Sequence, residues 1–327
     1  MSRDTEVAAF LAAHGFSHAA VAPLAQDASF RRYLRITGGP RPAVLMDAPP
    51  PEDVASFVRI DAHLAAAGLS VPDIIGVDLA SGLLLEEDLG DDLFPAVAKW
   101  GPMLDAAVDT LVAMQRAAPP AGLPKWSAAQ MSATAQSTLL DWWWPAMFGG
   151  PAPDAARRDF ADALDRMLAP VAAGPSGFVH RDFFAGNLVW LPDRPGVRRV
   201  GVIDFQGAAL GHPAYDLVSL VQDARRAFPP GVPERAVARY VQARPELDPV
   251  AFEAAFIACA AQRHLRVAAQ WVRLARRDGR PGYLAYGPHT WHLLGKALKH
   301  PAAAPLAAAM DRWIPPDCRK NPPEAAA

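Results

Sequence analysis

The chain of 327 residues has little cysteine and no long hydrophobic run. Its two cysteines, Cys259 and Cys318, are far apart and form no Cys/His ligand pattern, which argues against a disulfide framework and a structural zinc site. The chain contains no stretch of about 18 strongly apolar residues, so no membrane-spanning helix is predicted. The acidic segment 1–6 does not match a secretory leader. We therefore expect a cytoplasmic protein that makes no membrane contact.

An excess of one charge is also absent. The chain carries 32 Lys and Arg against 34 Asp and Glu, a formal net charge of −2 at pH 7. Such a balance gives no general attraction for nucleic acid or anionic membranes. With 51% apolar residues, the chain can bury a large core in roughly two domains or lobes. We expect a small-molecule partner, no nucleic acid, and a monomer as the favoured state.

The most informative segment is 178–188, with the sequence FVHRDFFAGNL, and segment 200–205 follows it with VGVIDF. Transfer of a γ-phosphoryl group requires Mg²⁺ and a carboxylate that takes the proton of the acceptor hydroxyl. A loop of the form H-R-D-x-x-x-x-N supplies both kinds of group. The pattern predicts Asp182 as the catalytic base. Asn187 and Asp204 offer the hard oxygen ligands that Mg²⁺ prefers.

Short apolar strands are expected at 177–179, 188–191 and 200–203, so that the loop and the strand end can converge. A further segment, 207–220, reads GAALGHPAYDLVSL. The motifs HRDFFAGN, IDFQ and GHPAYDL resemble the aminoglycoside phosphotransferase-like family of small-molecule kinases, relatives of protein kinases. The resemblance implies a two-lobed kinase-like fold that uses ATP and Mg²⁺.

The same resemblance implies roles for individual residues. Asp182 corresponds to the catalytic base, and Asn187 and Asp204 to the metal ligands. His180 supports the catalytic loop, and Asp216 braces it through backbone hydrogen bonds. For Asp216 the alternative is an ordinary acid in a first helical turn, where the helix dipole favours negative charge.

A narrower likeness involves segments 27–33, 44–50, 84–91 and 262–265. They resemble the bacterial branch of kinases that act on the anomeric hydroxyl of N-acetylmuramate and N-acetylglucosamine. The likeness spans most of the chain and implies a sugar 1-phosphate product in peptidoglycan recycling. A kinase of another small alcohol, such as an aminoglycoside, a choline-like compound or a hydroxy amino acid, is one alternative. A nucleotide-binding pseudokinase is another.

Two features of the wider kinase pattern are missing. There is no G-x-G-x-x-G loop, and the polar turn around Ser29 followed by Arg31 and Arg32 stands in its place. Met46 occupies the strand end where a lysine would pair with the nucleotide phosphates, and a thioether cannot replace an ammonium. Either arginine could carry that charge, or the site could depend on Mg²⁺ alone. We therefore predict Ser29, Arg31 and Arg32 as nucleotide-binding residues.

The fold class expected is α+β, with a small β-rich N-lobe and a larger, mainly helical C-lobe. We expect the N-lobe at 1–90, the C-lobe at 91–315 and a flexible tail at 316–327. The acidic segment that follows the last N-lobe strand would form the hinge, where the backbone of Glu87 and Leu89 would bind adenine. The elements expected in the N-lobe are helices at 5–15 and 51–67 and strands at 31–37, 43–46, 74–77 and 83–85.

Three residues are candidates for the acceptor site. Trp144, in the run DWWWP, could stack on a sugar, although core packing is the commoner use of tryptophan. Arg263 and His264 lie on a predicted helix and could bind a hydroxyl or a carboxylate of the substrate. Hydrogen bonds that brace the lobe are the equally weighted alternative for this pair.

Overall fold

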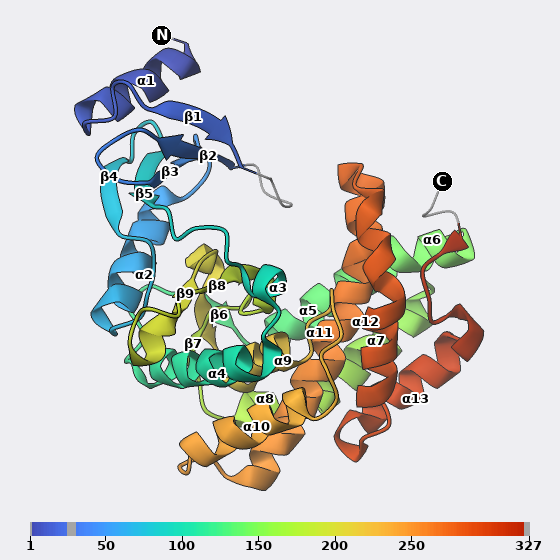
Figure 1. Ribbon diagram of the computed structural model, residues 1–327. Coiled ribbons are helices and arrows are strands. Elements are labelled where there is room, and N and C mark those ends of the chain that lie inside the picture. The colour runs from blue at the N-terminus through green and yellow to red at the C-terminus, as the bar shows by residue number, and fades with distance from the viewer. Residues whose placement is uncertain (1, 25–30, 324–327) are drawn as a thin grey trace. The chain divides into compact units, whose positions relative to one another are not determined.

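The computed structural model describes residues 2–24 and 31–323, which form two compact units (Figure 1). Unit 1 contains the chain up to residue 99 and residues 186–207, and unit 2 contains residues 100–185 and the chain from 208 onward. The expected lobe boundary at residue 90 assigned 186–207 to the other lobe. These residues join unit 1 because their strands bond to its backbone: Val202 N–H donates to Ser70 O (2.8 Å), and Trp190 N–H donates to Asp92 O (2.7 Å).

Unit 1 is built on an antiparallel five-stranded sheet of order β1-β2-β3-β5-β4. Strands β2 to β5 confirm the expected ones. Strand β1 was not predicted, because its side chains are all exposed and show no alternation of apolar and polar residues. The strands are β1 (Ala20–Pro23), β2 (Arg32–Thr37), β3 (Ala43–Asp47), β4 (Ile74–Asp78) and β5 (Leu83–Glu87).

Helices and a hairpin complete unit 1. Helix α2 (Val54–Ala66) begins at Asp53, whose carboxylate caps it by accepting from Ser56 N–H (2.9 Å). The pair β8 (Leu188–Trp190) and β9 (Val200–Val202) forms a separate two-stranded sheet. The other helices are α1 (Arg3–Ala13) and the short α3 (Phe94–Val97).

Unit 2 is mainly helical and surrounds the long, central α11 (Pro249–Asp278). Asp248 caps α11, and Gly279 ends it with a φ of 65°, a left-handed conformation that glycine adopts without strain. A small sheet contains β6 (Lys125–Trp126), β7 (Gly177–Val179) and β10 (Ala209–Gly211). The remaining α-helices are α4 (Trp100–Arg116), α5 (Ala128–Thr138), α6 (Trp144–Phe148), α7 (Asp154–Met167), α8 (Ala169–Ala173), α9 (Ala214–Val221), α10 (Val232–Ala243), α12 (Gly287–Ala297) and α13 (Ala304–Trp313).

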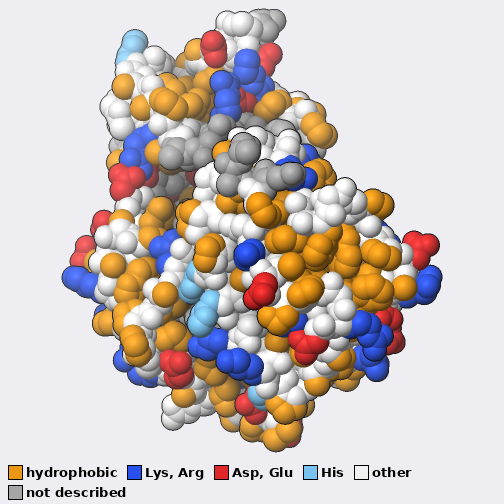
Figure 2. Space-filling view, turned by 90° about the vertical axis from the view of Figure 1, so that its right-hand side faces the viewer, with side chains coloured by type: hydrophobic (Ala, Val, Ile, Leu, Met, Phe, Trp, Pro, Cys, Tyr) orange, Lys and Arg blue, Asp and Glu red, His pale blue; other side chains and the backbone are white. Residues whose placement is uncertain are grey.

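The segment expected as a flexible tail differs from that expectation over residues 316–323. Its backbone and side chains are used in packing: Trp143 Nε1 donates to Lys320 O (2.9 Å), and Asn321 Nδ2 donates to Leu284 O (2.6 Å). A sequence rich in alanine and proline does not reveal such partners. Among the described residues, none of the helices combines the length and apolar character needed to cross a membrane. Figure 2 shows basic and acidic side chains interspersed on the face in view.

Candidate active site

The candidate catalytic loop follows β7, and side-chain acceptors in unit 2 bind its backbone N–H groups. The buried Asp216 on α9 accepts hydrogen bonds from the N–H groups of His180 (2.7 Å) and Arg181 (2.9 Å). The N–H of Asp182 contacts Nδ1 of the fully buried His180 at 3.3 Å. Arg181 has a φ of 74°, a strained conformation for a non-glycine residue that is typical of functional loops. The Asp182 side chain is left exposed.

Asp216 therefore occupies the bracing position that the family resemblance implied. Burial raises the pKa of Asp216 to about 7, while the two backbone donors and Arg263 act in the opposite direction. A carboxylate is needed here because an ionised Asp offers acceptors to both N–H groups at once. The alternative, an ordinary acid in a first helical turn, would not explain a side chain with no exposed surface.

Two arginines of α11 lie within electrostatic reach of Asp182. Arg263 is 5% exposed, and its Nε and Nη1 have no hydrogen-bond partner within the described part of the chain. Burial lowers its pKa, and the charge of Asp182 is among those that oppose this shift. Arg266 donates from Nη2 to Tyr215 Oη (3.1 Å). Burial lowers the pKa of Arg266, and the charges of Tyr215 and Asp182 raise it. The sequence did not single out Arg266, although its position three residues after Arg263 puts it on the same helix face.

The candidate metal ligands lie together in unit 1. Asn187 precedes β8 and Asp204 follows β9, so the antiparallel register that pairs Leu188 with Val202 brings them to the same end of the hairpin. Asn187 Nδ2 donates to Asp204 Oδ2 (3.2 Å), and Gln206 Nε2 donates to Asp204 Oδ1 (2.5 Å). Asp204 has a φ of 63°, another strained position.

This donor set suits Mg²⁺ bound with a nucleotide. Asp204 supplies an exposed carboxylate, and Asn187, whose amide nitrogen donates to Asp204, adds an amide oxygen at the same end of the hairpin. The described residues contain no group of three or more His, Cys, Asp or Glu side chains that could form an all-protein cage. Mg²⁺ commonly takes one or two protein oxygens and completes its octahedron with phosphate and water.

The two candidate phosphate arginines have different surroundings in unit 1. Arg31 Nε pairs with Glu52 Oε2 (2.7 Å), whereas Arg32 is bound to Asp47, which also pairs with Arg3 (2.5 Å). The sequence had given Glu52 no partner, because the contact joins residues far apart in the chain. Ser29 lies outside the described residues.

Tyr33 is affected by the charges of Arg31 and of the candidate metal ligand Asp204, and it contacts Met46 at the substituted strand position. Its hydroxyl donates to Met46 Sδ (3.5 Å), and Met46 is fully buried. Burial raises the pKa of Tyr33, the charges of Glu86 and Asp204 raise it further, and Arg31 lowers it. Tyr33 is therefore within electrostatic reach of both Arg31 and Asp204.

Of the expected hinge residues, Glu87 is the last residue of β5 and Leu89 follows the strand. Glu87 N–H donates to Asp73 O (2.9 Å), which leaves its carbonyl as the group that could accept from adenine. The methyl group Cδ1 of Leu89 lies against Gly201 of β9, where an added Cβ would come within 2.9 Å of it. Arg35 on β2 forms ion pairs with Asp88 and Asp91 (2.7 Å each), which hold the segment after β5 against the sheet.

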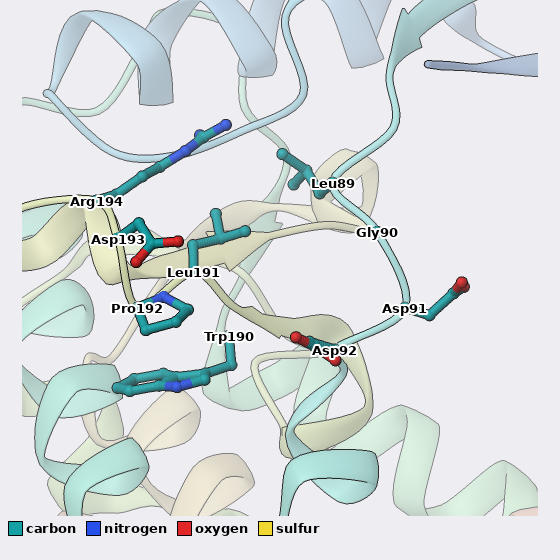
Figure 3. Close-up of a pocket in the computed structure, with 9 residues that line it drawn as sticks. All are labelled: Leu89, Gly90, Asp91, Asp92, Trp190, Leu191, Pro192, Asp193 and Arg194. Atoms are coloured by element: carbon teal, nitrogen blue, oxygen red, sulfur yellow. The ribbon is translucent and has the colours of Figure 1, made fainter.

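A pocket of about 300 Å³ borders the hinge within unit 1 (Figure 3). Residues 89–92 form one side, and residues 190–194 form the other. Arg194 is held by Glu87 Oε1 (2.7 Å) and Ser70 Oγ (3.0 Å). Leu89 is the member that this pocket shares with the expected adenine contacts.

The structure separates the acceptor candidates. Arg263 lies near Asp182, whereas His264 is fully buried with Nε2 at 2.8 Å from Gln222 Oε1. Burial lowers the pKa of His264 well below its ordinary value. Trp144 is 6% exposed, and the centroid of its ring lies 4.8 Å from that of Phe148. These surroundings favour a bracing role for His264 and core packing for Trp144.

Comparison with known proteins identifies the family of the chain. A family model described as "Phosphotransferase enzyme family" matches residues 20–252. The chain is 36% identical to an N-acetylmuramate/N-acetylglucosamine kinase of Caulobacter vibrioides, over 97% of this chain and 98% of that one. It is 34% identical to a kinase of the same name from Pseudomonas aeruginosa, over 87% and 86% of the two chains.

Among solved structures, a choline/ethanolamine kinase family protein from Mesorhizobium loti superposes with a TM-score of 0.65 at 17% identity, covering 94% of this chain and 99% of that one. At that identity the likeness concerns the fold alone, and it confirms the expected kinase-like fold with a β-rich part and a mainly helical part. With the family model matching residues 20–252 and the motifs HRDFFAGN and IDFQ in place, the chain belongs to the phosphotransferase enzyme family.

Proposed function

We propose that this protein is an MgATP-dependent kinase that phosphorylates the anomeric hydroxyl of an amino sugar, N-acetylmuramate or N-acetylglucosamine. The observation that carries the proposal is the exposed Asp182 on a loop that Asp216 fixes, in a chain 36% identical over almost its full length to a kinase named for these sugars. Asp182 would accept the proton of the attacking hydroxyl. An anomeric hydroxyl is more acidic than other sugar hydroxyls, which suits a carboxylate base.

Unit 1 would bind the nucleotide and unit 2 the acceptor. Asn187 and Asp204 would hold Mg²⁺, which neutralises charge on the transferred phosphate when it is bound. Arg31 would provide the cation that the strand lacks at Met46. The carbonyl of Glu87 and the N–H of Leu89 would bind adenine. We keep Ser29 as a phosphate-binding candidate, and Arg32 as a weaker one because its side chain is half exposed to solvent, whereas that of Arg31 is largely buried.

Charge near the base distinguishes the acceptor classes. Arg263 and Arg266 both couple electrostatically to Asp182. An aminoglycoside or a choline-like alcohol is cationic and would be repelled by two arginines, whereas a neutral or acidic sugar would not. The arrangement supports the amino sugar over the cationic acceptors. The intact Asp182, Asn187 and Asp204 argue against a pseudokinase.

The proposal implies a setting. Because the kinase would use ATP, we place it in the cytoplasm. Because its acceptors are components of peptidoglycan, we place it in the recycling of cell-wall sugars. We propose that it acts as a monomer, since the reaction assigns roles only to residues of one chain.

Phosphorus NMR of reactions with each sugar, ATP and Mg²⁺ tests the function. The expected product shows phosphate coupled to the C1 proton. A 6-phosphate product would contradict the assigned hydroxyl. Absence of turnover with both sugars, together with turnover of an aminoglycoside or choline, would overturn the acceptor class while leaving the kinase chemistry in place.

A further inference from the structure

An ion pair of unit 1 links the hinge to the loop that joins β8 and β9. Arg194, in that loop, donates from Nη2 to Glu87 Oε1 (2.7 Å) and from Nη1 to Ser70 Oγ (3.0 Å). The side chains of Arg194 and Glu87 are 27% and 22% exposed, so water screens the pair only in part. Two hydrogen bonds from one planar guanidinium also fix its direction. The pair therefore holds the hinge more firmly than an exposed ion pair would.

Both partners of Arg194 are themselves held by the backbone of unit 1. Glu87 Oε2 accepts from the N–H of Asp73 (3.3 Å), and the N–H of Glu87 donates to Asp73 O (2.9 Å). Ser70 is 2% exposed, and its carbonyl accepts from the N–H of Val202 on β9 (2.8 Å). With Arg194, these contacts form one chain of hydrogen bonds from the end of β5 to β9. In such a network each bond orients the next.

Arg194 also lines the pocket of about 300 Å³ beside the hinge, between residues 89–92 and 190–194 (Figure 3). The guanidinium of Arg194 extends away from the ring of Trp190 in this view. The two walls bond directly where Trp190 N–H donates to Asp92 O (2.7 Å). Side chains that face a cavity make no packing contacts across it. The position of the hinge therefore depends on the hydrogen bonds around the pocket.

The same contacts reach the candidate metal site. Strand β9 ends at Val202, and Asp204 follows two residues later. The bonds of Arg194 and Ser70 thus connect the segment that would hold the base with the strand that carries a ligand for Mg²⁺. The spacing of base and phosphates in a nucleotide is set by its covalent structure. A site that holds both parts at the matching spacing before binding loses less free energy to ordering.

We propose that Arg194 is a positioning residue that fixes the hinge and thereby selects adenine over hypoxanthine in the nucleotide. The inference rests on the proposed function and names a residue on which the choice of phosphate donor depends. Adenine presents an acceptor at N1 and a donor at N6, whereas hypoxanthine presents a donor at N1 and an acceptor at O6. The carbonyl of Glu87 and the N–H of Leu89 match adenine only while the hinge keeps its direction. Arg194 touches no substrate and acts through Glu87.

Steady-state kinetics with ATP and ITP as donors test the assignment in Arg194→Gln, Arg194→Lys and the control Arg199→Gln. Arg199 is exposed and belongs to the same loop, so the control removes an equal charge from the same segment. For Arg194→Gln we expect the ratio of kcat/KM for ATP to that for ITP to fall at least about fivefold, the scale of a hydrogen bond between charged groups. The KM for ATP should rise while kcat stays close to wild type. Arg194→Lys should lose a smaller part of the ratio, because it keeps the charge without the planar fork, and the control should leave it unchanged.

A second variant keeps the test decisive if Arg194→Gln does not fold. Glu87→Gln removes the partner's charge and leaves the hinge backbone in place, so it should lower the same ratio. In the double variant the ratio should fall no further than in Arg194→Gln, because both changes break one contact.

The outcomes separate the inference from the function on which it rests. An equal loss with ATP and ITP, or an unchanged ratio in a variant whose unfolding temperature is normal, would overturn the role of Arg194 and leave the kinase intact. Equal use of ATP and ITP by the wild-type protein would also overturn this role only. If the wild-type protein phosphorylates neither sugar, the proposed function fails. The ratio of ADP to IDP affinity in calorimetry then decides the role of Arg194 in the same way.

Discussion

Replacing Asp182 by Asn tests the base assignment most directly, because the structure separates its chemical effect from its structural effect. The side chain is exposed, and the hydrogen bonds that fix the loop come from the backbone of His180, Arg181 and Asp182 itself. Asn keeps the shape of the side chain and leaves those bonds unchanged. The free energy of unfolding should therefore change by no more than about 1 kcal/mol, through the lost attraction between Asp182 and the two arginines of α11.

The chemical effect should be much larger. An amide cannot take the proton of the acceptor, and loss of a general base lowers rates by about 10²–10⁴-fold. A hundredfold loss of kcat corresponds to about 2.7 kcal/mol in the activation barrier. We expect that loss in a coupled assay of ADP release with N-acetylglucosamine, with the KM for ATP within about threefold of wild type, since uniform binding is retained.

The matched control is Asp165→Asn, which changes another exposed aspartate of unit 2, on α7. It should keep normal turnover, and both variants should unfold at the wild-type temperature. If Asp182→Asn retains more than a tenth of the wild-type kcat, Asp182 is not the base. If its unfolding temperature drops by several degrees, the backbone argument for the loop is wrong.

The remaining predictions concern unit 1. Asp204→Ala should abolish the Mg²⁺-dependent part of ADP binding in calorimetry, because the site loses its carboxylate ligand. If the wild-type protein binds ADP with equal affinity with and without Mg²⁺, the metal site is refuted. Arg31→Ala should lower kcat/KM for ATP at least about tenfold. Arg32→Ala should stay within about twofold, because the Arg32 side chain is half exposed to solvent, whereas that of Arg31 is largely buried. The reverse order would exclude Arg31 as the phosphate ligand. Burial raises the pKa of Glu86 to about 8 and that of Asp61 to about 7. Above about pH 4 the unfolded chain therefore binds fewer protons than the folded one. The stability that is present at low pH is lost as the pH rises toward 8. The unfolding temperature should fall from pH 6 to pH 8.5, and less steeply in Glu86→Gln; identical slopes would show that Glu86 is not buried as an acid.

Much of the fold could be predicted because its signals are local. The strands at 188–191 and 200–203, for example, are short apolar runs bounded by turn residues, and the structure places them within one residue of that expectation. The bracing contact of Asp216 was implied by the family resemblance, which the motif GHPAYDL carries. Strand β6, with two residues, is too short to show a period and was not predicted.

The site residues that were missed depend on contacts between distant segments. Arg266 on α11 donates to Tyr215 on α9, 51 residues away in the chain, and nothing in its own neighbourhood indicates this. Glu52 had no visible partner because Arg31 lies 21 residues away. In both cases the sequence showed a charged residue, and only tertiary structure showed what surrounds it.

Met46 raises the question of how a kinase site works without the usual strand lysine. The position is fully buried in the sheet, and a hydroxyl, that of Tyr33, already contacts its sulfur. What the chemistry requires is a cation near the phosphates, held in place by an acid. The pair of Arg31 and Glu52 has this character, and Tyr33 lies within electrostatic reach of both Arg31 and Asp204. Because a guanidinium remains charged at any pH that the enzyme would meet and binds phosphate oxygens in a bidentate manner, moving the cation from β3 to the residue before β2 would preserve its function.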